Sequence, residues 1–314
     1  MCSNQILENN EYWQNIQKYK EKYFGSQDEH FKSNYPNNNN NVKLVYQKTI
    51  ILEPHGSIGE NRKCCFSFPE LDTNKLVFKN LRLNKNYDDV IHSCEISCGG
   101  SMIDKVWGRT FKTLRYLYNI DDPTIIPFYF NMNNEYFPNN ASTQIYMHFS
   151  SGNLDGFELS IDIFEIDDSN FDENNYTYDN IIVQCQNTGP EIASNGTNVG
   201  KYRLDYNHVM DYILLSIPDT TINHIILQLD GYNAIDMSTE NLVCYDNHYI
   251  IPMTKSLNCD NIITYGINFS RCDNTILCIK HNTIINSSSN VYIYGISHNA
   301  IKVTNKMVGL MYSK

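Results

Sequence analysis

A long series of short strand-like segments, separated by turn residues, constrains the fold of this chain more than any other feature. The clearest segment is Phe157–Ile166, in which apolar and polar side chains alternate residue by residue. Such alternation is typical of an antiparallel strand with one buried and one solvated face. We therefore expect Glu158 and Asp162 to lie together on a solvated face. Many strands of this kind, with turns between them, predict an all-β protein.

The predicted strands form two consecutive series, separated by the acidic run Asp167–Asp179. The first series is Val42–Leu52, Lys75–Leu83, Val90–Cys98, Ile125–Phe130, Gln144–Phe149 and Phe157–Ile166. The second is Ile181–Cys185, Tyr212–Ile217, Ile222–Leu229, Leu242–Tyr245, Tyr249–Pro252, Ile262–Phe269, Thr275–Lys280 and Val291–Ile296. Two β-sandwich domains follow from this division. The strand pattern alone fits jelly rolls and immunoglobulin-like sandwiches equally.

Two segments have helical rather than strand periodicity. In Glu11–Phe24 the large apolar residues recur at steps of three and four, which predicts a helical arm before the first strand. Pro36 and the asparagines around it, within Ser33–Asn41, predict a loop after this arm. Asp104–Ile120 has near-helical spacing as well, and we expect a short helix or an irregular segment there.

Charge and hydropathy exclude several classes of protein. The 314 residues include 24 basic and 35 acidic side chains, giving a net charge of -11, and the basic residues form no stripe. Sequence-independent binding to nucleic-acid phosphates is therefore not expected. No apolar run approaches the ~18 residues of a membrane-spanning helix. The first residues, MCSNQILENNEYW, lack the basic and then apolar pattern of a signal peptide.

The ten cysteines do not follow a metal-binding or disulfide pattern. No Cys-x-x-Cys pair occurs, and Cys94 and Cys98 are four residues apart. We expect reduced thiols, as in a cytoplasm. Cys185, Cys244 and Cys278 lie in apolar strand-like runs, where a free cysteine behaves as a small buried hydrophobic residue.

The residues required by common catalytic sites are not found at the required spacing. No His-x-His pair, which a cupin metal site would need, occurs among the nine histidines. Glu158 and Asp162 would lie about 13 Å apart along a strand, whereas the carboxylates of glycosidases lie ~5–9.5 Å apart. The Gly-x-Ser-x-Gly, phosphate-loop and dinucleotide-binding motifs are also missing. We expect no enzymatic activity, no catalytic residues, no bound metal and no cofactor.

Four stretches carry a resemblance to a known family. They are CEISCGGSMIDKVWG at Cys94–Gly108, IIPFYFNMNNEYFP at Ile125–Pro138, YGINFSRCDN at Tyr265–Asn274, and the closing segment Val291–Tyr312. In this order they resemble the double jelly-roll capsid proteins of nucleocytoplasmic large DNA viruses, either the giant-virus major capsid protein family or a short paralogue of it. The matching residues are Gly99, Gly100, Ile103, Asp104, Pro127, Phe128, Phe130, Asn268, Phe269, Ser270, Arg271, Asp273, Gly309 and Leu310.

The resemblance implies a fold and a function. It implies two tandem eight-stranded antiparallel jelly rolls, at residues 42–170 and 171–314, after a partly helical arm at residues 1–41. A homotrimer would form a pseudo-hexagonal capsomer of an icosahedral viral shell, with neighbouring trimers and minor capsid proteins as partners and no direct contact with nucleic acid. The protein would belong to the virion and would assemble in the host cytoplasm. The alternatives are a minor capsid or scaffold protein of the same lineage, and a jelly-roll protein that binds glycans through exposed tyrosines.

Overall fold

The computed structural model describes Gln14 and residues 43–311, except for 56–62, 74, 133–134, 140–141, 151–155, 169–170, 172–174, 189–196, 217–221, 255–265, 286–290 and 306. The predicted helical arm Glu11–Phe24, apart from Gln14, and the predicted loop Ser33–Asn41 lie outside these residues. Within the described part of the chain, no helix combines the length and the apolar character needed to cross a membrane.

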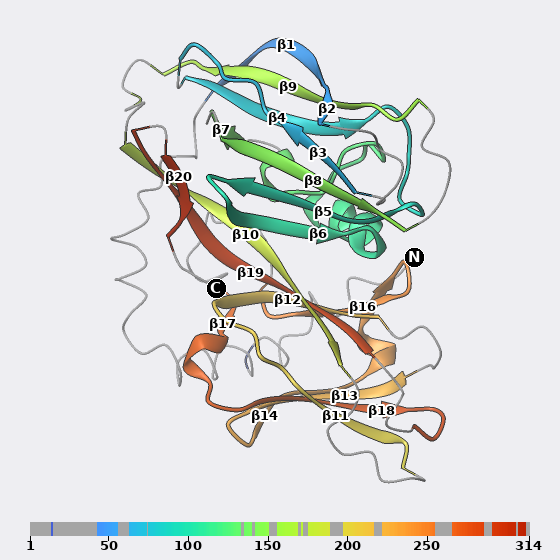
Figure 1. The fold of residues 1–314 in the computed structure, drawn as a ribbon. Coiled ribbons are helices and arrows are strands. Elements are labelled where there is room, and N and C mark those ends of the chain that lie inside the picture. The colour runs from blue at the N-terminus through green and yellow to red at the C-terminus, as the bar shows by residue number, and fades with distance from the viewer. Residues whose placement is uncertain are drawn as a thin grey trace. The chain divides into compact units, whose positions relative to one another are not determined.

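The described chain forms four antiparallel sheets within two compact units (Figure 1). We call residues 43–182 and 299–311 the first sandwich, and residues 183–298 the second sandwich. The first sandwich thus includes the last described residues of the chain. The prediction of an all-β fold is confirmed.

Two sheets make up the first sandwich, each named here by a central strand. The β9 sheet has the order β1 (Leu44–Leu52), β9 (Leu159–Ile166), β4 (Leu76–Leu83) and β7 (Phe137–Pro138). The β8 sheet has the order β2 (Pro54–His55), β3 (Lys63–Ser67), β8 (Thr143–Phe149), β5 (Ile91–Cys98) and β6 (Ser101–Trp107).

Alternating apolar side chains form the core of the first sandwich. Leu159 and Ile161 of β9 are fully buried, as are Ile145 and Met147 of β8. Aromatic contacts link the two sheets, since the ring of Phe68, just after β3, lies 4.6 Å from that of Phe78 in β4. Pairs at this distance add to the stabilisation that comes from burying apolar area.

The remaining strands form the other two sheets. The β12 sheet has the order β10 (Asn175–Thr188), β19 (Val291–Thr304), β12 (Val209–Ser216), β16 (His248–Pro252) and β15 (Val243–Tyr245), with β17 (Ile267–Asn268) paired to β12 and β20 (Met307–Leu310) paired to β19. The β18 sheet has the order β11 (Val199–Arg203), β18 (Thr275–His281), β13 (Ile222–Leu229) and β14 (Tyr232–Ser238).

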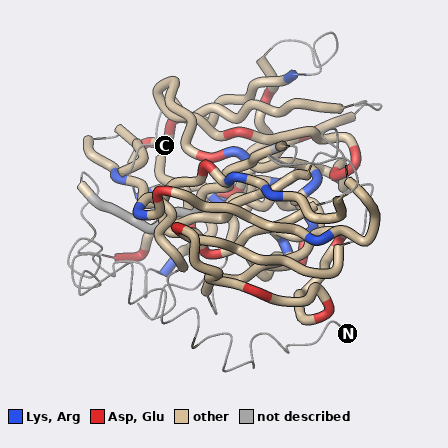
Figure 2. The backbone as a smooth tube through the Cα atoms, turned by 90° about the horizontal axis from the view of Figure 1, so that it is seen from below, with Lys and Arg blue, Asp and Glu red and all other residues tan. Residues whose placement is uncertain are grey.

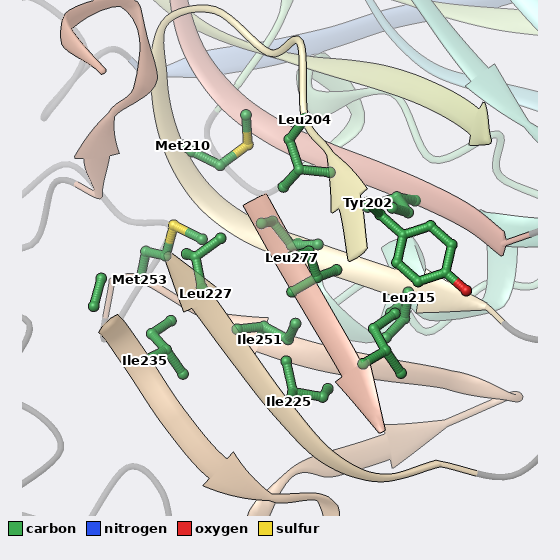
Figure 3. Close-up of a cluster of buried hydrophobic side chains, with 14 of the residues drawn as sticks. Tyr202, Leu204, Met210, Leu215, Ile225, Leu227, Ile235, Ile251, Met253 and Leu277 are labelled. Atoms are coloured by element: carbon green, nitrogen blue, oxygen red, sulfur yellow. The ribbon is translucent and has the colours of Figure 1, made fainter. Parts of the chain in front are cut away.

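The core of the second sandwich lies between these two sheets. Figure 3 shows Leu215 and Ile251 of the β12 sheet together with Ile225, Leu227 and Leu277 of the β18 sheet. All five side chains are fully buried. They come from segments far apart in the sequence, so this core forms only when both sheets are in place.

The two sandwiches share one strand order. The order β1-β9-β4-β7 opposite β3-β8-β5-β6 reappears as β10-β19-β12-β16 opposite β11-β18-β13-β14. In the first sandwich β1 pairs with β9, and β3 pairs with β8. In the second, β10 pairs with β19, and β11 pairs with β18. Eight strands of each sandwich therefore occupy equivalent positions.

The helix predicted within Asp104–Ile120 begins later than expected. Residues up to Trp107 belong to β6, a 3-10 turn covers Gly108–Thr110, and helix α4 covers Phe111–Tyr118. The prediction was wrong for the first part because the preceding glycine turn leads the chain back along β5, where Val106 pairs with Cys94. The helix ends at Asn119, which adopts a left-handed conformation with φ 55°.

The prediction of a strand at Ile125–Phe130 was also wrong. Its only strand-like contact among the described residues is one bridge between Ile125 and Arg82, and Tyr129–Asn131 form a 3-10 turn. Pro127 has no N–H group to donate to a ladder. Seven strands were not predicted, because they are short or contain proline, lysine, glycine or asparagine; these are β2, β3, β6, β7, β11, β14 and β20. Two further 3-10 turns cover Thr239–Asn241 and Phe269–Arg271. The second of these turns directly follows the short strand β17.

Candidate functional site

The Gly99–Gly100 pair forms the turn between β5 and β6. Both residues have positive φ angles, 57° and 83°, which glycine adopts without steric cost. The Gly99 N–H donates to the carbonyl of Ser142 at 3.3 Å. Ile103 and Asp104, which follow in β6, are buried, and an Asp104 carboxylate oxygen accepts from the N–H of Lys105 at 2.7 Å. This part of the resemblance builds a hairpin.

The Pro127–Phe130 segment contributes aromatic rings to the core. Phe128 and Phe130 are buried, and their rings are stacked with centroids 5.6 Å apart. Phe130 also contacts Phe137 of β7, at 5.3 Å. Asn131, which the sequence reasoning did not identify, holds the segment on β4: its side chain accepts from the N–H of Leu81 at 3.1 Å and donates to the carbonyl of Ile126 at 2.6 Å.

The Asn268–Asp273 segment fastens a turn to the start of β12. The Asn268 side chain accepts from the N–H of Ser270 at 3.0 Å, and the Ser270 hydroxyl accepts from the N–H of His208 at 2.8 Å. Phe269 is buried, and its N–H donates to the carbonyl of His208 at 2.9 Å. Arg271 and Asp273 are exposed.

Gly309 and Leu310 belong to β20, where they pair with Lys302 and Ile301 of β19. Strand β20 also lies against β6, which carries Ile103 and Asp104. The structure therefore places the closing segment beside the glycine hairpin in the first sandwich, whereas Asn268–Asp273 belong to the second. Each set of residues contributes to backbone turns and packing.

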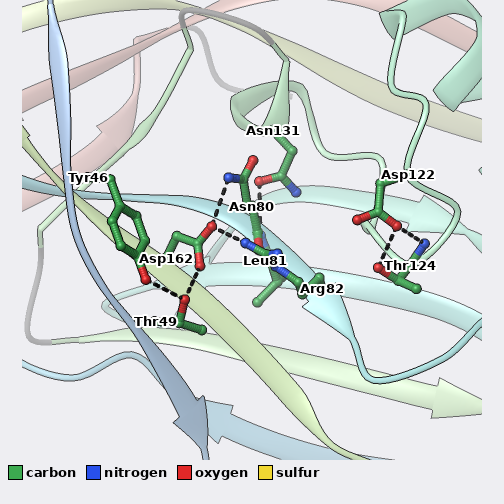
Figure 4. A network of polar contacts seen from close by, with 9 residues as sticks. All are labelled: Tyr46, Thr49, Asn80, Leu81, Arg82, Asp122, Thr124, Asn131 and Asp162. Atoms are coloured by element: carbon green, nitrogen blue, oxygen red, sulfur yellow. Dashed lines mark hydrogen bonds and ion pairs between the residues drawn. The ribbon is translucent and has the colours of Figure 1, made fainter.

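A polar network lies on the outer face of the β9 sheet (Figure 4). The carboxylate of Asp162 accepts from the Thr49 hydroxyl at 2.6 Å and from the Asn80 amide at 2.9 Å, and it forms an ion pair with Arg82. Asn80 has a φ of 54° and lies where the register between β4 and β9 shifts. The network thus joins β1, β9 and β4.

Asp162 corrects the expectation of a solvated strand face. Its exposed fraction is 3%, while Glu158 on the same strand face is exposed. The partners that bury Asp162 lie on strands about 80 and more than 100 residues earlier in the chain. No feature of Phe157–Ile166 itself indicates them.

Lys79 is a second charged group of the first sandwich, and its side chain is half-buried. Its ammonium donates to the carbonyl of Glu135 at 2.7 Å and to the carbonyl of Met132. Burial lowers the pKa of Lys79 to about 8, because a buried ammonium loses its hydration. These bonds hold the segment after the 3-10 turn against β4, which is a structural role.

Two buried histidines lie beside polar side chains in the second sandwich. The Tyr202 hydroxyl and a ring nitrogen of His281 are 3.1 Å apart. His298 Nε2 lies 3.0 Å from a carboxylate oxygen of Asp211, whose other oxygen accepts from the N–H of Gly266 at 3.2 Å. Burial lowers the pKa of both imidazoles, that of His298 to about 4.

The cysteines of the described chain are all free thiols. Cys278 is buried as expected, but Cys185 is only half-buried and Cys244 is exposed, so the prediction of a buried Cys244 was wrong. Cys244 lies on β15, the last strand in its sheet order, where β16 is its one neighbouring strand among the described residues. Among the residues that the structure describes, no three histidine, cysteine or acidic side chains are grouped as a metal site.

Comparison with protein-family models and with curated protein sequences finds no match. Solved structures do match. The PBCV-1 virus capsid chain aligns over 91% of this chain and 100% of its own, with a TM-score of 0.65 and 15% identity. The fold of this chain is the double jelly roll. The strand order that its two sandwiches share is what such a repeat requires.

Two further capsid proteins support the same fold. The Faustovirus major capsid protein aligns over 97% of this chain and 99% of its own, with a TM-score of 0.54 and 8% identity. The major capsid protein P2 from bacteriophage PM2 aligns over 85% of this chain and 98% of its own, with a TM-score of 0.51 and 11% identity. The double jelly roll expected from the four resembling stretches is therefore confirmed.

Proposed function

We propose that this chain is a structural capsid protein that forms homotrimers, and that these pseudo-hexagonal capsomers tile an icosahedral viral shell. The observation that carries the proposal is the alignment of nearly the whole chain with the whole of the PBCV-1 capsid chain. The side chains named by the resemblance support it, because they build turns and packed cores. Their role is structural, and the protein has no enzymatic activity.

The repeated strand order supports a trimer. Three chains supply six sandwiches of equivalent topology, which is the number that a hexagonal block needs. Closed rotational symmetry is the usual outcome for homo-oligomers. Obligate interfaces of this kind bury on the order of 2,000–5,000 Å².

The partners of this trimer are neighbouring capsid trimers and minor capsid proteins, within a virion assembled in the host cytoplasm. Direct contact with nucleic acid is not part of the proposal. Figure 2 shows basic and acidic residues interspersed along the described backbone, and the net charge of the chain is -11. Both properties disfavour phosphate binding. The division into an arm at residues 1–41 and jelly rolls at 42–170 and 171–314 remains part of the proposal.

The mass of the purified native protein tests this function. We expect a particle of three chains of 36.4 kDa each, with a hexagonal outline in electron micrographs. A monomer that binds to a glycan array would instead support the glycan-binding alternative. Quantifying the protein in purified virions separates a major from a minor capsid protein, since only a major one is the most abundant shell component.

A further inference from the structure

The outer face of the β18 sheet carries a basic strip on its β11 side. Lys201 and Arg203 of β11 and Lys280 of β18 are exposed, and their strand positions place them on the face opposite the core. Neither strand contains an acidic residue. Val199 is 39% exposed and pairs with Lys280, which adds an apolar side chain to the strip.

The charges on this strip are available for an external partner. Arg203 has a neighbour in Asp205, at 3.3 Å, but both side chains are more than half exposed. Such surface pairs contribute little. A concentration of positive charge is unusual on a chain with a net charge of -11, and it favours a partner with acidic groups.

The β1–β9 side of the β9 sheet has the complementary character. Residues 43–53 and 158–168, outside the buried Asp162, carry five carboxylates and two lysines. The carboxylates are those of Glu53, Glu158, Glu165, Asp167 and Asp168. Tyr46 and Ile51 lie on the outer face of β1 and are 54% and 62% exposed. This edge thus carries more carboxylates than lysines beside exposed apolar side chains, although the carboxylate of Asp167 is paired with Lys43 and Glu165 lies on the opposite strand face from Glu158.

Strand β1 is also at the end of its sheet, with β9 as its one neighbour in the sheet order of the described residues. Exposed edge strands with apolar side chains tend to be covered in assembled proteins. Strand β11 has the equivalent end position in the β18 sheet. Both surfaces therefore combine an edge strand, exposed apolar side chains and an excess of charge of one sign, basic on β11–β18 and acidic on β1–β9.

We propose that the β11–β18 strip of one chain binds the β1–β9 surface of a second copy of the chain. The inference rests on the proposed trimer and identifies the surfaces that join its subunits. Two basic strips would repel each other, as would two acidic surfaces, so the contact is between unlike surfaces. An interface between unlike surfaces closes into a ring when the rotation allows it, and a trimer is such a ring.

Charge reversal tests this contact in the full-length protein. K201E/K280E places acidic groups against an acidic surface, so we expect the dissociation constant of the trimer to rise by roughly tenfold or more. The matched control is K112E/K302E, which changes the net charge equally at two exposed lysines outside both surfaces. We expect the control to change the constant less than about twofold. Sedimentation equilibrium measures the constant, and circular dichroism checks that each variant is folded.

The reciprocal variant E53K/E158K should weaken the trimer in the same way. A chain that carries both sets of reversals presents opposite charges again, and we expect it to recover the trimer. Trimers unaffected by K201E/K280E, or no recovery in the combined variant, would overturn this inference while leaving the capsomer proposal in place. A wild-type chain that stays monomeric at all concentrations would overturn the capsomer proposal itself.

Discussion

The guanidinium of Arg115 binds the carboxylate of Asp88 through two parallel hydrogen bonds, of 2.7 and 2.8 Å, with both side chains buried. Arg115 also donates to the carbonyl of Ile125 at 2.8 Å. The pair therefore connects helix α4 with the segment before β5 and with the chain after the helix. Removing either partner leaves a buried charge without compensation.

Loss of this pair should be among the most destabilising changes in the first sandwich. We expect Asp88→Asn to lower the free energy of unfolding by about 3–5 kcal/mol, because a buried arginine loses its counter-charge. Denaturant titration measures the loss. The control is Asp167→Asn, at an exposed pair with Lys43, which should cost about 0–1 kcal/mol. Equal costs for the two variants would contradict the buried geometry.

Substitutions of Asp162 and Glu158 should change the free energy of unfolding by different amounts, although the sequence pattern places both residues on one strand face. Asp162→Asn removes the charge that binds Thr49, Asn80 and Arg82. We expect a cost of about 1–3 kcal/mol, typical of hydrogen bonds to charged groups. The Arg82 side chain is one-third exposed, so the cost should be smaller than that of Asp88→Asn. Glu158→Gln should be neutral, and a larger effect there would contradict the network.

Gly108 has no room for a side chain. A Cβ atom at this position would lie 1.8 Å from the carbonyl oxygen of Ile91, so the backbone would have to move. We expect Gly108→Ala to destabilise the protein by about 1–3 kcal/mol or more, as overpacked cores do. The matched control is Gly309→Ala, where nothing lies within 4 Å of the added atom. Thermal unfolding of both variants provides the comparison. Similar melting temperatures would contradict the close packing around Gly108.

Acid should destabilise the second sandwich through His298. Burial lowers the pKa of His298 from 6.5 to about 4, so between these pH values only the unfolded chain takes up this proton. The free energy of unfolding therefore falls as the pH decreases from 6.5 to 4, by about 3 kcal/mol at most from this group. His281, whose pKa is also lowered by burial, acts in the same direction.

Urea titrations at pH 7.5 and pH 5 measure this dependence, and His298→Gln should reduce it. The carboxylate of Asp211, 3.0 Å from His298, acts in the opposite direction because it favours the charged imidazole. Detection of a protonated His298 at pH 6 by NMR would mean that Asp211 outweighs burial.

Local alternation predicted the strands well where one face of a strand meets the core. Phe157–Ile166 and Ile222–Leu229 are of this kind, and the structure has β9 and β13 there. The prediction failed where distant parts of the chain decide the environment. Asp162 is buried by β1 and β4, and Asp104–Trp107 is a strand because the Gly99–Gly100 turn pairs it with β5.

The candidate site residues show the same limit. The resemblance identified Gly99, Gly100 and Asn268, and the structure explains them as a turn with positive φ angles and as a side chain that closes a turn. Asn131 and Arg115 have comparable structural roles and were not identified. Their partners, Leu81 and Asp88, are 50 and 27 residues away, and a single sequence contains no signal of such contacts.

The first sandwich contains residues 299–311, including β20 and the end of β19. The ribosome therefore synthesises most of this domain early but supplies residues 299–311 only after the second sandwich. Until then the nascent first sandwich lacks β20, the strand that lies against β6. Completion of the early domain therefore waits for synthesis of the later one, and deletion of residues 299–311 would damage the half of the molecule that is made first.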